Sequence, residues 1–138
     1  ALIKKFYEAT KNSSKFVTCW GTGTPLREFM HVDDLGAASV FALENWDPKS
    51  QNSPKDINGD PLYFLNVGTG KDISIKDLAI KIARIIGFRG TILWDDKKPD
   101  GTPKKQLNIE KISKLGWSPK ITLDKGLKDT LEIFKKNY

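Results

Sequence analysis

The sequence predicts an α/β fold for its 138 residues, and three observations support that prediction. Short runs of strand-forming residues alternate with longer stretches whose apolar residues recur at helical spacing. Turns containing Gly and Pro separate the two kinds of segment. With 38% hydrophobic residues, the chain also has enough apolar surface for an ordinary core. This composition excludes a disordered chain, a collagen-like repeat and a coiled coil.

The first elements predicted are a helix, a strand and an extended segment. Residues 1–9 are expected to be helical, because their apolar residues fall on one helical face. Residues 16–20 alternate strand-forming side chains and predict a strand, which a tight turn at residues 21–25 ends. Residues 27–32 then predict a second short strand. The apolar face of the first helix consists of Leu2, Ile3, Phe6 and Ala9.

A second helix is predicted at residues 33–45. Asp33 and Asp34 are expected to cap it, because a carboxylate accepts from the free N–H groups of a helix start and favours the positive end of the dipole. A polar loop is predicted at residues 47–60, and the compact apolar run at residues 62–67 predicts a strand. The inner stripe of this helix is expected to consist of Leu35, Ala38, Ala42 and Leu43.

The third helix has clear signals at both ends. Ser74 is a good N-cap, with Asp77 three residues further on as in a capping box. Gly87 supplies the left-handed residue that ends many helices. The residues between them carry apolar side chains at helical spacing, so we predict a helix there. A strand is predicted next, at residues 91–94.

The last third of the chain predicts a charged loop and two helices. The loop occupies residues 97–105 and contains two Pro and one Gly. A short helix follows, begun by Asn108 and ended by Gly116. Thr122 is expected to cap a final helix. The number of strands is small for a self-contained doubly wound sheet, and the chain opens without Met inside a helical pattern, so we expect a piece of a longer polypeptide.

The net charge of +6 is concentrated at one end of the chain. Residues 1–96 carry 12 basic and 12 acidic residues, whereas residues 97–138 carry 11 Lys and five acidic residues. A local basic excess of this size favours an anionic partner, such as a phosphorylated small molecule, a nucleic acid or an acidic surface. A solvated Lys-rich surface is the alternative.

Other features restrict the class of protein. No apolar run approaches the roughly 20 residues that a membrane helix needs, and no signal peptide is visible. The single Cys, Cys19, excludes an internal disulfide framework, and no group of Cys and His has zinc-ligand spacing. We therefore expect a soluble, cytoplasmic protein with no membrane partner and no metal.

Several motifs resemble functional sites but have simpler interpretations. The Gly-rich turns at residues 21–24 and 68–70 complete neither a dinucleotide fingerprint nor a P-loop, so we interpret both as structural turns. Cys19 lies within a predicted strand and is expected to be a buried, inert thiol. His31 is the only imidazole and could act as an acid or base, but next to two Asp residues it is interpreted as a hydrogen-bonded structural residue.

Two segments carry the most informative pattern. In Trp20-Gly-Thr-Gly-Thr-Pro-Leu-Arg27, a turn fixes the distance between the Trp20 ring and the Arg27 guanidinium. The planar array of N–H donors on a guanidinium suits a diphosphate. In Lys98-Pro-Asp-Gly-Thr-Pro-Lys-Lys105, a stiffened loop carries three Lys around Asp100. Such a loop can place ammonium groups on phosphate oxygens while Asp100 accepts hydrogen bonds from a sugar or base. Taken alone, each segment could also be a solvated charged loop.

Together with Leu65-Asn-Val-Gly-Thr-Gly and with Leu115-Gly-Trp before a terminal helix, these segments resemble the GDP-L-fucose synthase family. Its members epimerise and reduce GDP-4-keto-6-deoxy-D-mannose. The R-x-F-x-H-V-x-D pattern at residues 27–34 is shared broadly by extended short-chain dehydrogenase/reductase enzymes that act on sugar nucleotides. The pattern at residues 98–105 is more specific to fucose synthases. The resemblance covers essentially all of residues 1–138 and only the C-terminal part of the family's chain.

The resemblance implies that residues 1–138 are the C-terminal, GDP-sugar-binding lobe of an NADP(H)-dependent GDP-L-fucose synthase, with the Rossmann core largely missing. The family's catalytic and cofactor-binding residues lie upstream, so this chain is assigned no catalytic, cofactor-binding or metal-binding residue and is expected to be inactive alone. Cys19 and His31 match neither catalytic position. Residues 34–45 and 62–67 are expected to pack on the Rossmann lobe. The substrate contacts implied by the resemblance are Lys5, Trp20, Arg27, Asp100 and Lys105.

The partners implied by the resemblance are a GDP-sugar and, for the full-length protein, a second copy in a homodimer; no nucleic acid is implied. Two alternatives stay open. The first is another sugar-nucleotide epimerase, dehydratase or reductase of the same superfamily. The second is a basic nucleic-acid-binding module at residues 97–138, although Trp94 and Trp117 are not interleaved with the Lys residues as stacking platforms.

Overall fold

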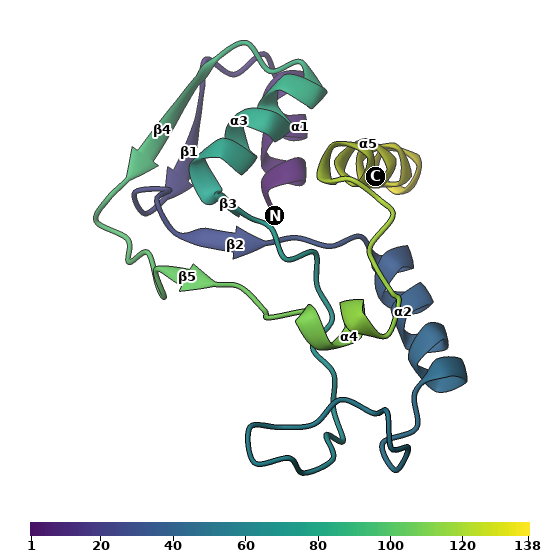
Figure 1. The fold of residues 1–138 in the computed structure, drawn as a ribbon. Helices are drawn as coiled ribbons and strands as arrows, with labels where there is room; N and C mark the ends of the chain where they lie inside the picture. The colour runs from purple at the N-terminus through teal and green to yellow at the C-terminus, as the bar shows by residue number, and fades with distance from the viewer. The chain divides into compact units, whose positions relative to one another are not determined.

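The computed structural model describes all 138 residues and confirms the alternation of helices and strands (Figure 1). The helices are α1 (Leu2–Lys11), α2 (Val32–Asn45), α3 (Ile75–Ile86), α4 (Glu110–Lys114) and α5 (Leu123–Asn137). The strands are β1 (Phe16–Trp20), β2 (Leu26–Glu28), β3 (Asp72–Ser74), β4 (Thr91–Asp95) and β5 (Lys104–Lys105).

The chain divides into two compact units, each built from segments that are separated in the sequence. Unit 1 comprises residues 1–27, 72–105 and 124–138, and unit 2 comprises residues 28–71 and 106–123. No helix in either unit is both long and apolar enough to cross a membrane.

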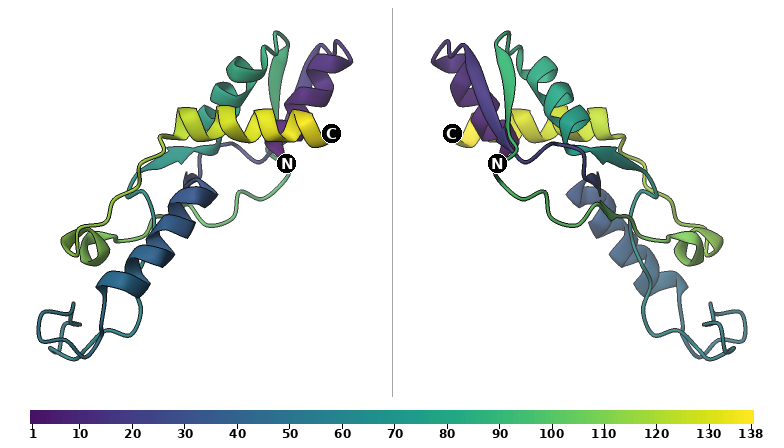
Figure 2. Two further views of the ribbon diagram at one scale, coloured as in Figure 1. Left: turned by 90° about the vertical axis from the view of Figure 1, so that its right-hand side faces the viewer. Right: turned by 90° about the vertical axis from the view of Figure 1, so that its left-hand side faces the viewer.

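Unit 1 contains a parallel pair of strands with helices on one face. β1 pairs with β4 in a register that runs from Phe16 opposite Thr91 to Trp20 opposite Asp95. Figure 1 shows α1 and α3 against this pair, and the right panel of Figure 2 shows the two strands running side by side. Because side chains alternate along a strand, Cys19 is buried on the covered side while Trp20 lies exposed on the other side.

The core of unit 1 forms where α1, α3 and β1 meet. Phe6 of α1 is fully buried and packs edge-on against Phe88, with the ring centroids 5.4 Å apart. The predicted caps of α3 are confirmed: the Ser74 hydroxyl accepts a hydrogen bond from the Asp77 N–H at 2.9 Å, and Gly87 takes a left-handed conformation at φ 84°. The apolar residues of α3 also face the core as the sequence pattern predicted: Leu78, Ala79, Ile82 and Ala83 are buried.

A second, three-stranded sheet in the order β3–β2–β5 adjoins the turn after β1. β2 and β5 are parallel, with Leu26 opposite Lys104 and Arg27 opposite Lys105. The strand predicted at residues 27–32 overlaps β2 only at its first two positions, and the sequence predicted neither β3 nor β5. These two strands have three and two residues, too few for an alternating pattern to be visible.

Unit 2 is organised around α2 and α4. Ala38 and Ile112 are fully buried, Trp117 is nearly so, and partly buried apolar side chains pack around them. The predicted short helix forms as α4, with the Asn108 side chain accepting from the Glu110 N–H at 2.9 Å.

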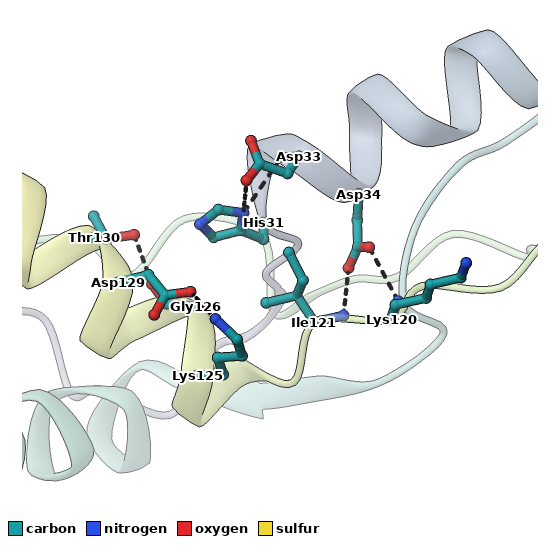
Figure 3. Close-up of polar contacts among 9 residues, drawn as sticks. All are labelled: His31, Asp33, Asp34, Lys120, Ile121, Lys125, Gly126, Asp129 and Thr130. Atoms are coloured by element: carbon teal, nitrogen blue, oxygen red, sulfur yellow. Dashed lines mark hydrogen bonds and ion pairs between the residues drawn. The ribbon is translucent and has the colours of Figure 1, made fainter.

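The prediction that the two Asp residues cap α2 is wrong. The N-cap is His31, whose Nδ1 accepts from the Asp33 N–H at 3.3 Å (Figure 3). Asp34 is buried and instead accepts the backbone N–H groups of Lys120 and Ile121 at 3.0 and 2.9 Å. The carboxylate that the local pattern assigned to the helix start thus binds the backbone of a distant loop at Lys120 and Ile121. His31 is structural, as the sequence suggested.

Two apolar features of unit 2 also differ from the prediction. Residues 62–67 form no strand, because no neighbouring strand supplies a hydrogen-bonding partner along this run. The stripe expected to face inward on α2 is largely open: Ala38 is buried, but Leu35 and Leu43 are 47% and 87% exposed. Tyr63 and Phe64 are exposed as well.

Candidate functional site

All five residues predicted to bind a substrate lie in unit 1. Arg27 and Lys105 occupy directly opposed positions on β2 and β5. Opposed residues of neighbouring strands project from the same face of a sheet, so the two cations are neighbours. The Arg27 guanidinium donates to the Leu26 carbonyl at 2.7 Å, and neither cation has a carboxylate partner in the structure. The pair is therefore an uncompensated positive site that suits an anion.

The neighbouring lysine has a different role. Lys104 Nζ lies 3.2 Å from the Asp72 carboxylate, so this ion pair joins β5 to β3 across β2. Asp72 thus neutralises Lys104. The positive charge left on this sheet belongs to Arg27 and Lys105.

Asp100 fastens the charged loop to the turn after β1. Its Oδ1 accepts from the Thr22 N–H at 2.7 Å, and its Oδ2 accepts from the Thr22 hydroxyl at 2.7 Å. These hydrogen bonds hold the pKa of the Asp100 carboxyl below its ordinary value, with a further contribution from the Gly23 N–H. Asp100 is consequently ionised at neutral pH, exposed, and able to accept a further hydrogen bond.

The same loop lies beside Trp20 and Arg27. Lys98 Nζ lies 5.6 Å from the centroid of the Trp20 ring, a cation–π distance. A Cβ placed on Gly101 would lie 3.9 Å from the Arg27 guanidinium. The structure therefore brings Trp20, Arg27, Asp100 and Lys105 into one region. That they bind a ligand stays a prediction.

Lys5 is the exception among the five. It extends from α1, on the face of the β1–β4 pair opposite Trp20, and its amine donates to the Thr18 carbonyl at 2.8 Å. Burial raises the pKa of the nearby Cys19 thiol, and the Lys5 charge only partly offsets that effect. Cys19 is thus a buried, protonated thiol, as its position in the predicted strand suggested.

The two Gly-Thr-Gly turns are both occupied by carboxylates of the chain itself. Asp100 accepts from the turn at residues 21–24, and Glu28 accepts from the Thr69 and Gly70 N–H groups and from the Leu107 N–H. Burial raises the pKa of Glu28, but these hydrogen bonds outweigh burial and leave it below the ordinary value. The N–H groups that could have held a phosphate therefore hold side chains, which supports the interpretation of both turns as structural.

Sequence reasoning missed the roles of Thr22, Lys98 and Glu28. Each acts through a partner that lies about 40 to 80 positions away, so no local pattern reports the contact. One signal was available: each Gly-Thr-Gly turn presents several free N–H groups, and such a turn needs an acceptor. The structure contains no cluster of three or more His, Cys, Asp or Glu placed to hold a metal.

Comparison with known proteins gives consistent matches. Residues 1–58 match the NAD dependent epimerase/dehydratase family. Over 99% of its length the chain is 40% identical to the probable GDP-L-fucose synthase 1 of Oryza sativa subsp. japonica and 41% identical to the GDP-L-fucose synthase of Escherichia coli (strain K12). It spans 38% and 41% of those proteins.

A solved structure agrees with these sequence matches. The NADP-bound GDP-mannoheptose C4 reductase of Campylobacter jejuni superposes on 97% of the chain with a TM-score of 0.81 and 32% identity, and 43% of that protein is covered. The fold is thus the one found in part of an extended short-chain dehydrogenase/reductase enzyme. By sequence, this chain is similar along nearly its whole length to GDP-L-fucose synthases, and it spans about two-fifths of theirs.

Proposed function

We propose that residues 1–138 form the C-terminal, GDP-sugar-binding portion of an NADP(H)-dependent GDP-L-fucose synthase. The complete protein would epimerise the keto sugar at two carbons and reduce its ketone by hydride transfer. In this proposal the portion described here binds and orients the sugar nucleotide. It takes no part in the proton or hydride transfers.

The observation that carries the proposal is the pair formed by Arg27 and Lys105. A sugar nucleotide bears a diphosphate with two negative charges, and this pair supplies two cations with no carboxylate to neutralise them. The guanidinium can meet two phosphate oxygens at once, while the lysine adds a point charge. A solvated charged loop would not need its cations on two adjacent strands in register.

The surrounding residues supply contacts of the other kinds that a sugar nucleotide needs. Trp20 is 71% exposed and offers an apolar plate next to the cations. The ionised Asp100 offers an acceptor for hydroxyl or amino groups. Lys5 is proposed as a further contact on the family resemblance alone, because in the structure its amine donates to the Thr18 carbonyl, away from the other four residues.

The rest of the complete protein has its own place in this proposal. NADP(H) would be the hydride donor, held outside residues 1–138, because the two Gly-rich turns here are filled by Asp100 and Glu28. The exposed apolar side of α2 and residues 62–67 would be covered by the Rossmann domain. We further propose a cytoplasmic homodimer, on the analogy of the family.

Competition between nucleotides tests the proposed function. GDP-L-fucose, UDP-glucose and dTDP-glucose are titrated by calorimetry into the complete polypeptide that carries this chain. The proposal predicts that GDP-L-fucose binds most tightly. Tighter binding of the UDP or dTDP sugar would assign the chain to another enzyme of the superfamily. A salt-dependent gel shift with DNA or RNA, unaffected by GDP-L-fucose, would assign it to nucleic-acid binding.

A further inference from the structure

Asp100 and Thr24 together use every hydrogen-bonding position of the Thr22 hydroxyl. This hydroxyl has one proton and two lone pairs. The proton goes to Asp100 Oδ2 at 2.7 Å, so the oxygen accepts from the Thr24 hydroxyl at 2.7 Å and from the Thr24 N–H at 3.2 Å. Thr22 is therefore held in one orientation, with its donor aimed at the charged loop.

The backbone around Thr22 is shaped for the close approach of this carboxylate. Gly21 has φ +76°, a conformation that favours glycine, and a Cβ there would lie 2.2 Å from Asp100 Oδ1. Any side chain at position 21 would push the carboxylate away. The glycine and the two hydrogen bonds from Thr22 are separate features that place Asp100 at the same point.

Placing Asp100 also places the residues on either side of it. Lys98, two positions before, reaches the Trp20 ring, and Gly101, the next residue, lies beside the Arg27 guanidinium. The loop is otherwise exposed, so little apolar burial holds it. Backbone hydrogen bonds hold its two ends, from the Lys98 N–H to the Asp95 carbonyl at 3.1 Å and from the Leu26 N–H to the Pro103 carbonyl at 2.8 Å. The hydrogen bonds that Asp100 receives from Thr22 hold the middle of the loop.

We infer that Thr22 is a positioning residue of the candidate site. Through Asp100 it holds the loop between β4 and β5, residues 96–103, beside Trp20 and Arg27. Thr22 itself need not touch the ligand, because both of its donors to Asp100 are used within the chain. The inference rests on the proposed GDP-sugar function and adds to it a positioning role for a residue to which the resemblance assigns no substrate contact.

Two variants of the complete polypeptide separate the hydroxyl from the shape of the side chain. Thr22→Val keeps the shape and removes the hydroxyl, whereas Thr22→Ser keeps the hydroxyl. Calorimetric titration with GDP-L-fucose is expected to show about tenfold weaker binding for Thr22→Val and binding within about twofold of wild type for Thr22→Ser. In turnover assays the KM of Thr22→Val rises while kcat at saturation holds.

A double-mutant cycle shows whether Thr22 acts through Asp100. If it does, Thr22→Val adds little to the loss already caused by Asp100→Ala. Losses that simply add would contradict the inference, as would wild-type affinity in Thr22→Val when the wild type binds. A wild-type protein that does not bind GDP-L-fucose would overturn the proposed function, and the inference with it.

Discussion

Asp34 in α2 accepts a hydrogen bond from the backbone N–H of Ile121, 87 positions further along the chain, at 2.9 Å. The adjacent Lys120 N–H donates to the other carboxylate oxygen. This single buried side chain therefore fixes the segment between α4 and α5 to the first turn of α2 (Figure 3).

Removal of the Asp34 carboxylate should strongly destabilise the protein. Asp34→Ala leaves two N–H groups without their charged acceptor, and we expect a loss of about 3 kcal/mol in the free energy of unfolding. Urea unfolding followed by tryptophan fluorescence measures it. Asp33→Ala is the matched control, because the Asp33 side chain is 76% exposed and its removal should change stability by less than about 0.5 kcal/mol. Equal effects of the two variants would contradict this role.

Two glycines are expected to respond to alanine in opposite directions. Gly36 lies in α2 with open space around its Cβ position, so Gly36→Ala should stabilise the protein by about 0.5–1 kcal/mol. Gly23 has φ +77°, and its Cβ would lie within 2.6 Å of the Trp94 ring. Gly23→Ala should therefore destabilise the protein by about 2 kcal/mol. Thermal unfolding of both variants checks this, and a tolerated alanine at position 23 would contradict the geometry of the turn.

The stability contributed by Glu28 should depend on pH. Its folded pKa is depressed, so this contribution is complete above the unfolded pKa, about 4.3, and is lost as the pH falls through the lower folded pKa. Glu28→Gln cannot lose a charge. The difference in unfolding free energy between wild type and Glu28→Gln should therefore shrink between pH 7 and pH 3 in urea titrations. A difference that stays constant over this range would show that the ionised form has no special role.

The portion at residues 1–138 should have no catalytic activity by itself. Its only Cys is buried with a raised pKa, and its only His caps α2, so neither is available for proton transfer. Incubation with GDP-4-keto-6-deoxy-D-mannose and NADPH should consume no NADPH. Measurable turnover would show that catalytic residues lie within this chain.

The sequence predicted those parts of the fold that local signals determine. Ser74 and Gly87 mark the ends of α3 because capping depends on residues within one turn of the helix end. β1 was predicted from the alternation of strand-forming residues within five positions, and β4 was predicted at residues 91–94. The residues of the candidate site were found by the pattern of charges, glycines and aromatic residues and by family resemblance, and the structure places four of the five in one region.

What the sequence could not predict depends on distant partners. β5 exists because Lys104 and Lys105 lie beside β2, which a pattern of two charged residues cannot indicate. Asp34 was assigned to a helix cap from its local position. The local pattern cannot show that its carboxylate accepts hydrogen bonds from a loop far along the chain. The run at residues 62–67 has the composition of a strand but no neighbour to pair with in this chain.

The affinity of Arg27→Ala for GDP-L-fucose tests the central claim most directly. Calorimetry on the complete polypeptide compares wild type, Arg27→Ala and, as a control, Arg84→Ala, whose cation lies in the last turn of α3. We predict that Arg27→Ala loses about 1.5–3 kcal/mol of binding free energy, since a hydrogen bond to a charged group is lost, and that Arg84→Ala binds like wild type. An unchanged dissociation constant for Arg27→Ala would contradict the account.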